Sequence, residues 1–284
     1  MRLIKSVAEM QKWAVKNGRD CGIVPTLGSL HEGHASLIKK ARSENGLVVV
    51  SVFVNPLQFK RDKFLAYPRN LREDMALAKK AGADVLFAPS ADDMYKNDFE
   101  SQIVLPKMFK TLAHQGLEWH YRGVLAVVMK LFQIILPARA YFGLKDPHQL
   151  ALIERMVADL NVPVKIRRCE TIREKSGLAR SSRNALLTAE ERKAATVIYK
   201  SLELAKARLR KNGHGNLRGV MSEMKKLIHA EKTARVEHIE IVDPASFLPF
   251  DKKSKEALVF TAVNVGGKRL TDNLRFTLPV SPRN

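Results

Sequence analysis

The chain has 284 residues, of which 45% are hydrophobic and 27% charged, and its formal net charge is +20. This length suits one large domain plus a small one, and the mixture of apolar and charged residues argues against a disordered chain. No window approaches the roughly 18 apolar residues of a membrane helix, and the N-terminus lacks the apolar core and cleavage site of a signal peptide. The sequence therefore predicts a globular protein that does not act in a membrane.

Two cysteines and many basic residues narrow the function further. Cys21 and Cys169 lie far apart and lack metal-ligand spacing, so the sequence predicts neither a disulfide framework nor a zinc site, and it favours the cytoplasm. The positive charge suits anionic ligands such as nucleotides and carboxylates. Because the Lys and Arg are scattered, with no aromatic-interleaved basic stripe, nucleic-acid binding is disfavoured.

The first part of the chain alternates between strand and helix patterns. A capping box at Ser6–Glu9 begins a helix that runs to about Val15. The segment Leu47–Val54 is almost entirely apolar and β-branched, which is typical of a strand buried on both faces of a parallel sheet. The other expected strands cover 21–27, 84–88, 140–143 and 164–168, and the other helices 31–43, 70–81, 124–135 and 148–160. This order predicts a doubly wound, Rossmann-like α/β domain.

The pattern changes after about residue 172. A second capping box, Thr188–Glu191, begins a long helix that the Asn212-Gly213 pair ends, and another helix follows over 217–230. Three strands over 236–242, 257–265 and 267–275 come last, with a Gly-Gly hairpin signal between the final two. We therefore expect domains at 1–171 and 172–284, the second a smaller α+β domain.

The sharpest local signal is His31-Glu-Gly-His34, between an expected strand and an expected helix. A helix N-terminus binds phosphate, and both imidazoles on its first turn could donate to phosphate oxygens. Gly33 would remove a side chain where a nucleotide presses on the backbone. The alternatives are a zinc pair without a third ligand, or two surface histidines.

Two further polar segments follow strands at the carboxyl edge of the sheet, where such sheets bind ligands. Gln58, in Asn55–Phe59, could fix a hydroxyl or carboxylate, although an ordinary turn is the alternative. Lys145 could neutralise charge on a reacting phosphate, and Asp146 could hold a ribose hydroxyl or magnesium. A surface salt pair is the alternative for these two.

A fourth segment, Ser181-Ser182-Arg183-Asn184, offers two hydroxyls and a guanidinium as phosphate ligands. Its alternative is a polar turn before the capped helix. Neither a GxGxxG pattern nor a Walker A pattern is present. Together the four segments predict an ATP site made of a helix N-terminus, a lysine and a Ser-Ser-Arg loop.

This ordered set resembles the pantothenate synthetase (pantoate–β-alanine ligase) family, within the nucleotidylyltransferase superfamily that shares the His-x-Gly-His motif. The resemblance runs from the first expected helix to the last expected strand. The motifs that carry it are Pro25-Thr-Leu-Gly28 with His31–His34, Val50–Phe59, Tyr67-Pro-Arg69, Gly82-Ala-Asp84, His120–Gly123, Phe142–Asp146, Met156–Leu160, Gly177–Asn184 and Ile239–Asp243.

The resemblance implies a reaction and a set of roles. ATP would adenylate pantoate, the amine of β-alanine would attack the adenylate, and AMP and pyrophosphate would be released. The implied catalytic residues are His31, His34, Lys145 and Arg183. The implied ATP contacts are Pro25, Leu27, Gly33, Phe142, Gly143, Asp146, Thr171, Ile172, Ser181 and Ser182. Leu27, Gln58 and Gln149 would hold pantoate. Magnesium would accompany ATP, with Asp146 as its candidate protein ligand, and the family is typically a homodimer.

Several positions depart from the family pattern and alter the rim of the expected site. The family has Met at Leu27, Gly at Lys60 and a basic residue at Leu117, and His148 and Arg180 also differ. Two alternatives therefore stand beside the ligase. One is a weakened or inactive relative that binds a nucleotide or nucleic acid. The other is an adenylyltransferase with a different small acid or a phosphate substrate.

Overall fold

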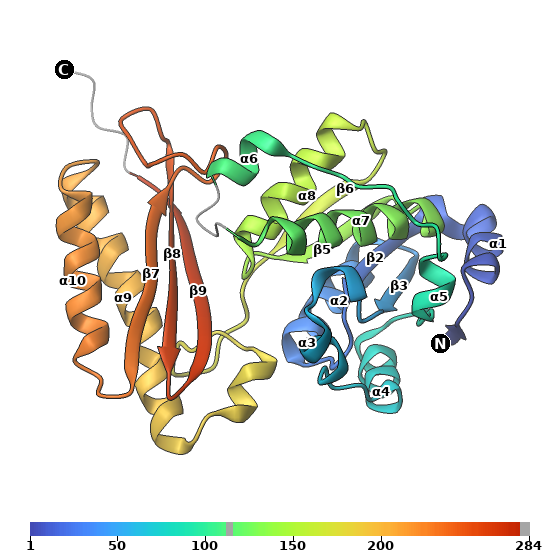
Figure 1. The fold of residues 1–284 in the computed structure, drawn as a ribbon, viewed down its shortest axis with the longest axis horizontal. Helices are drawn as coiled ribbons and strands as arrows, with labels where there is room; N and C mark the ends of the chain where they lie inside the picture. The colour runs from blue at the N-terminus through green and yellow to red at the C-terminus, as the bar shows by residue number, and fades with distance from the viewer. Residues whose placement is uncertain (112–115, 279–284) are drawn as a thin grey trace. The chain divides into compact units, whose positions relative to one another are not determined.

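A computed structural model describes residues 1–111 and 116–278 (Figure 1). Among these residues the first part holds strands β1 (Arg2–Ile4), β2 (Cys21–Thr26), β3 (Leu47–Val52), β4 (Val85–Phe87), β5 (Arg139–Gly143) and β6 (Lys165–Cys169). Its helices are α1 (Val7–Asn17), α2 (Glu32–Glu44), α3 (Arg61–Leu65), α4 (Leu71–Ala81), α5 (Ala91–Met94), α6 (Pro106–Thr111), α7 (Glu118–Ile135) and α8 (Pro147–Asp159). Short 3-10 turns are η1 (Gly18–Asp20) and η2 (Pro56–Gln58).

The six strands form one parallel sheet in the order β1-β4-β3-β2-β5-β6. The chain runs outward from β2 to β3 and β4, then returns to add β5 on the other side of β2. The strand order thus reverses beside β2, and ligands of open α/β sheets bind at the carboxyl ends of the strands at such a point. The doubly wound prediction is confirmed, and it directs attention to the ends of β2 and β5.

Helices cover both faces of this sheet. α2 packs on β2, β5 and α4, whereas α1 packs against α7. Beneath α2 and α4 lies an apolar core that includes Val24, Ile38, Val50 and Leu86, all fully buried. Val48, Val49 and Val50 of β3 are all fully buried although successive side chains point to opposite faces of the sheet, which explains this β-branched run.

The second part of the chain is an antiparallel sheet with two helices. It holds η3 (Ser182–Leu186), α9 (Ala189–Asn212), α10 (Leu217–His229), β7 (Ala234–Val242), β8 (Glu256–Val265) and β9 (Lys268–Thr277). The sheet order is β7-β8-β9, with α9 on β8 and β9 and α10 on β7. The predicted capping box is present, because the Thr188 hydroxyl accepts from the Glu191 amide and the Glu191 carboxylate accepts from the Thr188 amide. The predicted α+β unit is confirmed.

The described residues form two compact units. The large unit comprises 1–110, 116–144 and 148–170, and the small unit comprises Thr111, 145–147 and 171–278. The segment 145–147 thus groups with the small unit although it lies between β5 and most of α8. A domain boundary after residue 171 stays a prediction.

The short helices α3, α5 and α6 were not among the expected elements, and two further details also differ. β1 was not predicted, because a three-residue edge strand is too short for a periodic pattern. α7 begins at Glu118 rather than near Val124, because Leu117 provides no side-chain cap and the first turn is polar.

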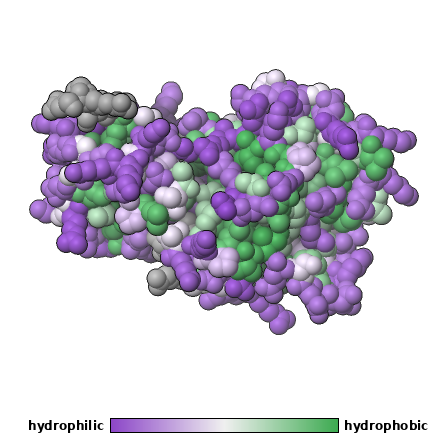
Figure 2. Space-filling model, turned by 90° about the horizontal axis from the view of Figure 1, so that it is seen from above, coloured by the Kyte–Doolittle hydropathy of each residue, from purple (hydrophilic) through white to green (hydrophobic). Residues whose placement is uncertain are grey.

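No helix within the described residues is long and apolar enough to cross a membrane. Hydrophilic side chains cover most of the face shown in Figure 2, interrupted by local apolar areas, as the charge of +20 leads one to expect.

Candidate active site

The turn after β2 is held in an unusual backbone conformation by a buried carboxylate. Gly28 and Ser29 have positive φ angles of 89° and 52°. Asp74 of α4 is only 2% exposed, and its two oxygens accept the amides of Ser29 (3.1 Å) and Leu30 (2.6 Å). These bonds fix the turn that leads into α2.

The first turn of α2 carries both histidines. His31 is the N-cap, and its Nδ1 accepts the amide of Gly33 at 3.1 Å. The Nδ1 of His34 accepts the amide of His31 at 3.3 Å, and the ring centroids are 4.1 Å apart. Because each Nδ1 is an acceptor, the proton of each neutral imidazole is on Nε2. The two rings therefore offer two N–H donors at the positive end of a helix, an arrangement suited to phosphate.

Gly33 leaves room for the neighbouring His31 ring. A Cβ at this position would lie 2.8 Å from Cε1 and 3.0 Å from Nδ1 of His31. The sequence predicted that Gly33 makes room for a nucleotide. Within the chain, its missing side chain makes room for the imidazole that caps α2.

Gln58 lies in η2, just beyond β3, and is 6% exposed. Its Oε1 accepts Nδ2 of Asn55 at 2.9 Å, and its backbone carbonyl lies 2.8 Å from Nδ1 of His120. Asn55 is itself held by Tyr95, whose hydroxyl donates to Asn55 Oδ1 at 2.9 Å. The Gln58 amide is therefore oriented by a buried network rather than by a loose turn.

The approach of α7 completes this support. A Cβ on Gly123 would lie 2.3 Å from the carbonyl oxygen of Leu57, so only glycine lets α7 reach the η2 backbone. Asn55 Nδ2 also donates to the Gly123 carbonyl at 3.0 Å. The His120–Gly123 motif thus contributes to the placement of Gln58.

The remaining predicted residues of the large unit lie on neighbouring elements. Pro25 is in β2, and Phe142 and Gly143 are the last residues of β5, which pairs with β2. Gln149 is half-buried in the first turn of α8. The sheet order places the carboxyl ends of β2, β3 and β5 next to one another, with α2 beginning at the same edge.

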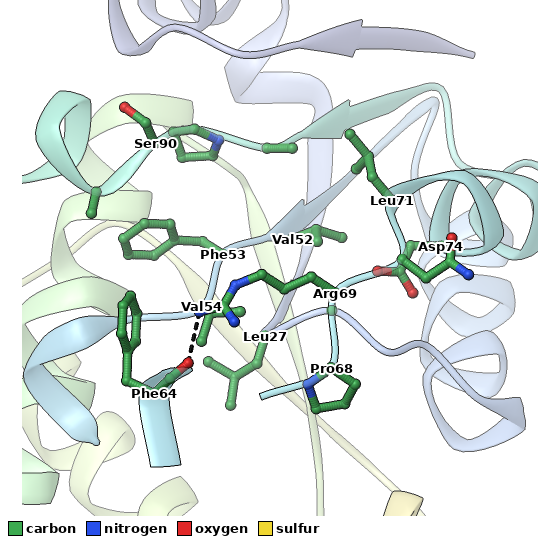
Figure 3. A pocket seen from close by; sticks show the side chains of 15 residues that line it. Leu27, Val52, Phe53, Val54, Phe64, Pro68, Arg69, Leu71, Asp74 and Ser90 are labelled. Carbon is green, nitrogen blue, oxygen red and sulfur yellow. Dashed lines mark hydrogen bonds between the residues drawn. The ribbon is translucent and has the colours of Figure 1, made fainter. Parts of the chain in front are cut away.

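A cavity of about 260 Å³ opens at the ends of β2, β3 and β4 (Figure 3). Of the predicted site residues only Leu27 lines it, so it lies on the β3–β4 side of β2, away from β5. Figure 3 shows Arg69 extending across it toward Phe64. The Arg69 guanidinium donates to the carbonyls of Phe64 (2.8 Å) and Tyr67 (2.9 Å), which gives it a structural role after α3.

In the small unit a backbone hairpin brings predicted ATP contacts side by side. The Arg180 amide donates to the Ile172 carbonyl, and the Glu174 amide donates to the Leu178 carbonyl. Thr171 and Ile172 therefore lie on the segment next to the one that leads into Ser181. Lys145, Ser181 and Arg183 line one narrow cavity, while Asp146 is exposed. The side chain of Ser182 lies outside what the structure describes.

Asp74 and Asn55 were missed by sequence reasoning, although a signal for Asp74 existed. Asp74, Ala78 and Ala81 are the buried residues of α4, so an acidic residue sits on the apolar stripe of an amphipathic helix. A buried carboxylate demands partners, and here they are the amides of the turn before the histidines.

The chain is similar to proteins of known function along almost its whole length. A family model described as pantoate-beta-alanine ligase matches residues 2–275. Pantothenate synthetase of Caldicellulosiruptor saccharolyticus is 43% identical over 272 residues, which cover 95% of this chain and 96% of the relative. Pantothenate synthetase of Clostridium botulinum (strain Loch Maree) is also 43% identical, over 97% of each chain.

Solved structures agree in fold. The crystal structure of pantothenate synthetase from Thermus thermophilus is 38% identical with a TM-score of 0.88, covering 96% of this chain and 99% of the other. Pantoate-beta-alanine ligase from Francisella tularensis, complexed with beta-gamma ATP and beta-alanine, is 33% identical with a TM-score of 0.76. That alignment covers 96% of this chain and 97% of the other.

Proposed function

Because the chain belongs to the pantoate–beta-alanine ligase family, we propose that it joins pantoate to β-alanine through a pantoyl adenylate. The observation that carries the proposal is the histidine pair. Both Nδ1 atoms accept backbone amides, so both Nε2–H groups serve as donors at the start of α2. A pair of donors at a helix N-terminus suits a phosphate that gains charge during reaction.

In the first step a carboxylate oxygen of pantoate attacks the α-phosphorus of ATP. An O–P bond forms, the bond to the β-phosphate oxygen breaks, and pyrophosphate leaves with its electron pair. Two anions must meet, so donors and cations lower the barrier. We assign His31 and His34 to the α-phosphate, Lys145 to the phosphate and the pantoate carboxylate, and Arg183 with Ser181 and Ser182 to the outgoing phosphates.

In the second step the amine of β-alanine attacks the acyl carbon of the adenylate. A C–N bond forms, the acyl–oxygen bond breaks, AMP leaves, and the nitrogen loses a proton. The acyl adenylate hydrolyses in water, so the enzyme must exclude water while it waits for the amine. The complex of the Francisella tularensis relative with a nucleotide and β-alanine supports these two ligands for this chain.

The pantoate contacts are assigned to Gln58, Gln149 and Leu27. Asn55 fixes the Gln58 carbonyl oxygen, which leaves the Gln58 NH₂ group as the donor for a hydroxyl or carboxylate of the substrate. A donor with a fixed orientation costs little entropy when the substrate binds.

The remaining ATP contacts are assigned to Pro25, Leu27, Gly33, Phe142, Gly143, Asp146, Thr171 and Ile172. We also propose Mg²⁺, held mainly by ATP phosphates and water. Magnesium commonly keeps several waters and takes one or two protein carboxylates, so exposed Asp146 fits as one ligand. Within residues 1–111 and 116–278 no three His, Cys, Asp or Glu side chains cluster, which suits a metal that arrives with the nucleotide.

We further propose a homodimer, as the family resemblance implies, in the cytoplasm. Cys21 and Cys169 are both free and buried, which is compatible with a reducing compartment. Sedimentation equilibrium tests the oligomeric state. A single species of twice the 32.0 kDa chain mass supports the dimer, and a monomer at all concentrations contradicts it.

The test of the reaction is ATP–pyrophosphate exchange with magnesium, with and without pantoate. Pantoate-dependent exchange supports adenylation, and formation of pantothenate and AMP after β-alanine is added supports the second step. Exchange with another small acid but not pantoate would favour the adenylyltransferase alternative. ATP binding by the folded protein without any exchange would favour the inactive relative.

A further inference from the structure

β9 carries two adjacent buried polar residues in the middle of the small unit. Asp272 is 2% exposed and Asn273 5% exposed. They pair with Thr261 and Phe260 of β8, so both lie near the middle of the β8–β9 ladder, on the edge strand of the sheet. Buried polar groups of this kind require specific partners.

The partner of Asn273 is the segment that carries Lys145. Nδ2 of Asn273 donates to the backbone carbonyl of Lys145 at 3.0 Å, across 128 residues of sequence. Lys145–Pro147 groups with the small unit, and Lys145 is half-buried there. The amide thus fixes the backbone from which the lysine side chain extends.

The partner of Asp272 is the loop that leads to Ser181. Arg173 donates to both carboxylate oxygens of Asp272, from Nη1 at 2.5 Å and from Nη2 at 2.9 Å. Arg173 also donates to the Gly177 carbonyl and stacks over the Tyr199 ring at 4.2 Å. Asp272 lines the same narrow cavity as Lys145, Ser181 and Arg183.

The electrostatics agree with this arrangement. Burial raises the pKa of Asp272, while Arg173 and Lys145 act in the opposite direction by attracting its negative charge. Lys145 is therefore close enough for its positive charge to interact with the Asp272 carboxylate. Arg173 is the residue that forms the direct ion pair with Asp272.

We propose that Asn273 is a positioning residue that holds Lys145 for adenylation, on a platform made by the Asp272–Arg173 ion pair. This inference rests on the proposed function. Asn273 acts on the lysine backbone and touches no substrate, so it governs the placement of the charge in the transition state. Its loss lowers kcat and leaves the KM values for ATP and pantoate nearly unchanged.

The variants are Asn273→Ala and the isosteric Asn273→Asp, which keeps the volume but replaces the donor with an acceptor. The matched control is Asn45→Ala. Asn45 is also a buried asparagine that donates to a backbone carbonyl (Ala41, 2.7 Å), but it lies before β3, at the opposite edge of the sheet from the histidines. Melting temperature and pantoate-dependent exchange are measured for each protein.

Displacing a catalytic group by about 1 Å costs on the order of 100-fold, so we expect both Asn273 variants to lose roughly 10- to 100-fold in kcat. We expect Asn45→Ala to keep kcat within about twofold of the wild-type value, even if its melting temperature falls as much as that of the Asn273 variants. The Asn273→Ala substitution is also made in a Lys145→Ala background, whose low exchange rate is measured at a higher enzyme concentration. There Asn273→Ala lowers kcat by less than about twofold, because the effects of residues that act as one unit are not additive.

Wild-type kcat for Asn273→Asp would overturn the inference, because packing alone would then suffice. So would an equal loss in the presence and absence of Lys145, or an equal kcat loss in the Asn45 control. These outcomes require exchange by the wild-type protein. If the wild type itself shows no exchange, the proposed function fails first and the inference fails with it.

Discussion

Asp74 joins α4 to the histidine-bearing turn although it contacts neither histidine. Its carboxylate accepts two amides from residues that precede His31, one of which has a positive φ angle. Among the described residues, no other side chain accepts the backbone amides of Ser29 and Leu30. The position of both Nε2 donors therefore depends on a residue outside the motif.

We predict that Asp74→Ala lowers the free energy of unfolding by about 1–3 kcal/mol, because the partly buried amides of Ser29 and Leu30 lose their acceptor. It also lowers kcat for pantoate-dependent exchange, because the histidines shift. Urea denaturation and exchange kinetics measure the two effects. Exposed Glu73→Ala, one residue earlier on α4, is the control and stays close to wild type in both. An unchanged kcat in Asp74→Ala would show that the turn before His31 keeps its conformation without the Asp74 carboxylate.

Lys145→Ala tests the proposed charge directly. Lys145 is half-buried in a cavity rather than in an apolar core, so we expect unchanged far-UV circular dichroism and a melting temperature near that of wild type. Exchange should fall at least 10²- to 10³-fold, the usual cost of removing one electrostatic stabiliser. Lys165→Ala, at an exposed position on β6, is the control. Loss of folding in Lys145→Ala would instead assign the residue a structural role.

At the scale of elements, α7 contacts η2 at Gly123, where there is no room for a side chain. We predict that Gly123→Ala lowers the free energy of unfolding by about 1–3 kcal/mol and raises the KM for pantoate, because the added Cβ displaces η2 and Gln58. Gly215→Ala is the control, since its nearest neighbour would be 3.6 Å away. Wild-type KM with lowered stability would separate the packing of α7 from the binding of pantoate.

Three elements of the large unit also meet at one carboxylate. Glu44 of α2 pairs with Lys40 (2.8 Å), with Arg167 of β6 (3.0 Å) and with the Tyr141 hydroxyl of β5 (2.9 Å). The hydrogen bond from Lys40, then the hydrogen bond from Tyr141 and the positive charge of Arg167, hold the pKa of Glu44 below its ordinary value of 4.5. A lowered pKa stabilises the fold above the unfolded value and ceases to do so as the pH falls through the folded value.

We therefore predict that Glu44→Gln lowers the melting temperature at pH 7 and that the difference from wild type shrinks as the pH falls below 4.5. Differential scanning calorimetry between pH 3 and 7 follows the difference. A difference that is constant with pH would mean that Glu44 contributes through packing and not through its charge.

The elements themselves could be predicted from the sequence where a local rule acts. The N-cap at Ser6, the capping box at Thr188 and the β-branched run of β3 each specify their element within a few residues, although Glu9 does not complete the capping box expected at Ser6. The support of the site could not be predicted, because Asp74, Asn55 and Asn273 act on partners 45, 68 and 128 residues away. No local pattern encodes such pairs. The histidine, lysine and serine motifs are recognisable because their residues are adjacent in sequence.

At the scale of the whole molecule, the two thiols report on folding. Burial, and secondarily Asp20, raises the pKa of Cys21 to about 12, and burial raises the pKa of Cys169 to about 11. We predict that neither reacts with a disulfide reagent at pH 8 in the native protein and that both react after denaturation, because the thiolate is the nucleophile. Absorbance during labelling gives the count. Rapid labelling of the native protein would contradict the burial of these cysteines.

The bond between Asn273 and the Lys145 carbonyl links the middle of the chain to the last strand that the structure describes. A polypeptide cut short before β9 retains every strand of the six-stranded sheet and both histidines. It lacks Asp272 and Asn273, so the Lys145 carbonyl loses the hydrogen bond from Asn273. Chains shortened by interrupted translation or by proteolysis would therefore adenylate their substrate much more slowly than the full chain. The adenylation rate of a preparation then depends on the fraction of its chains that include β9.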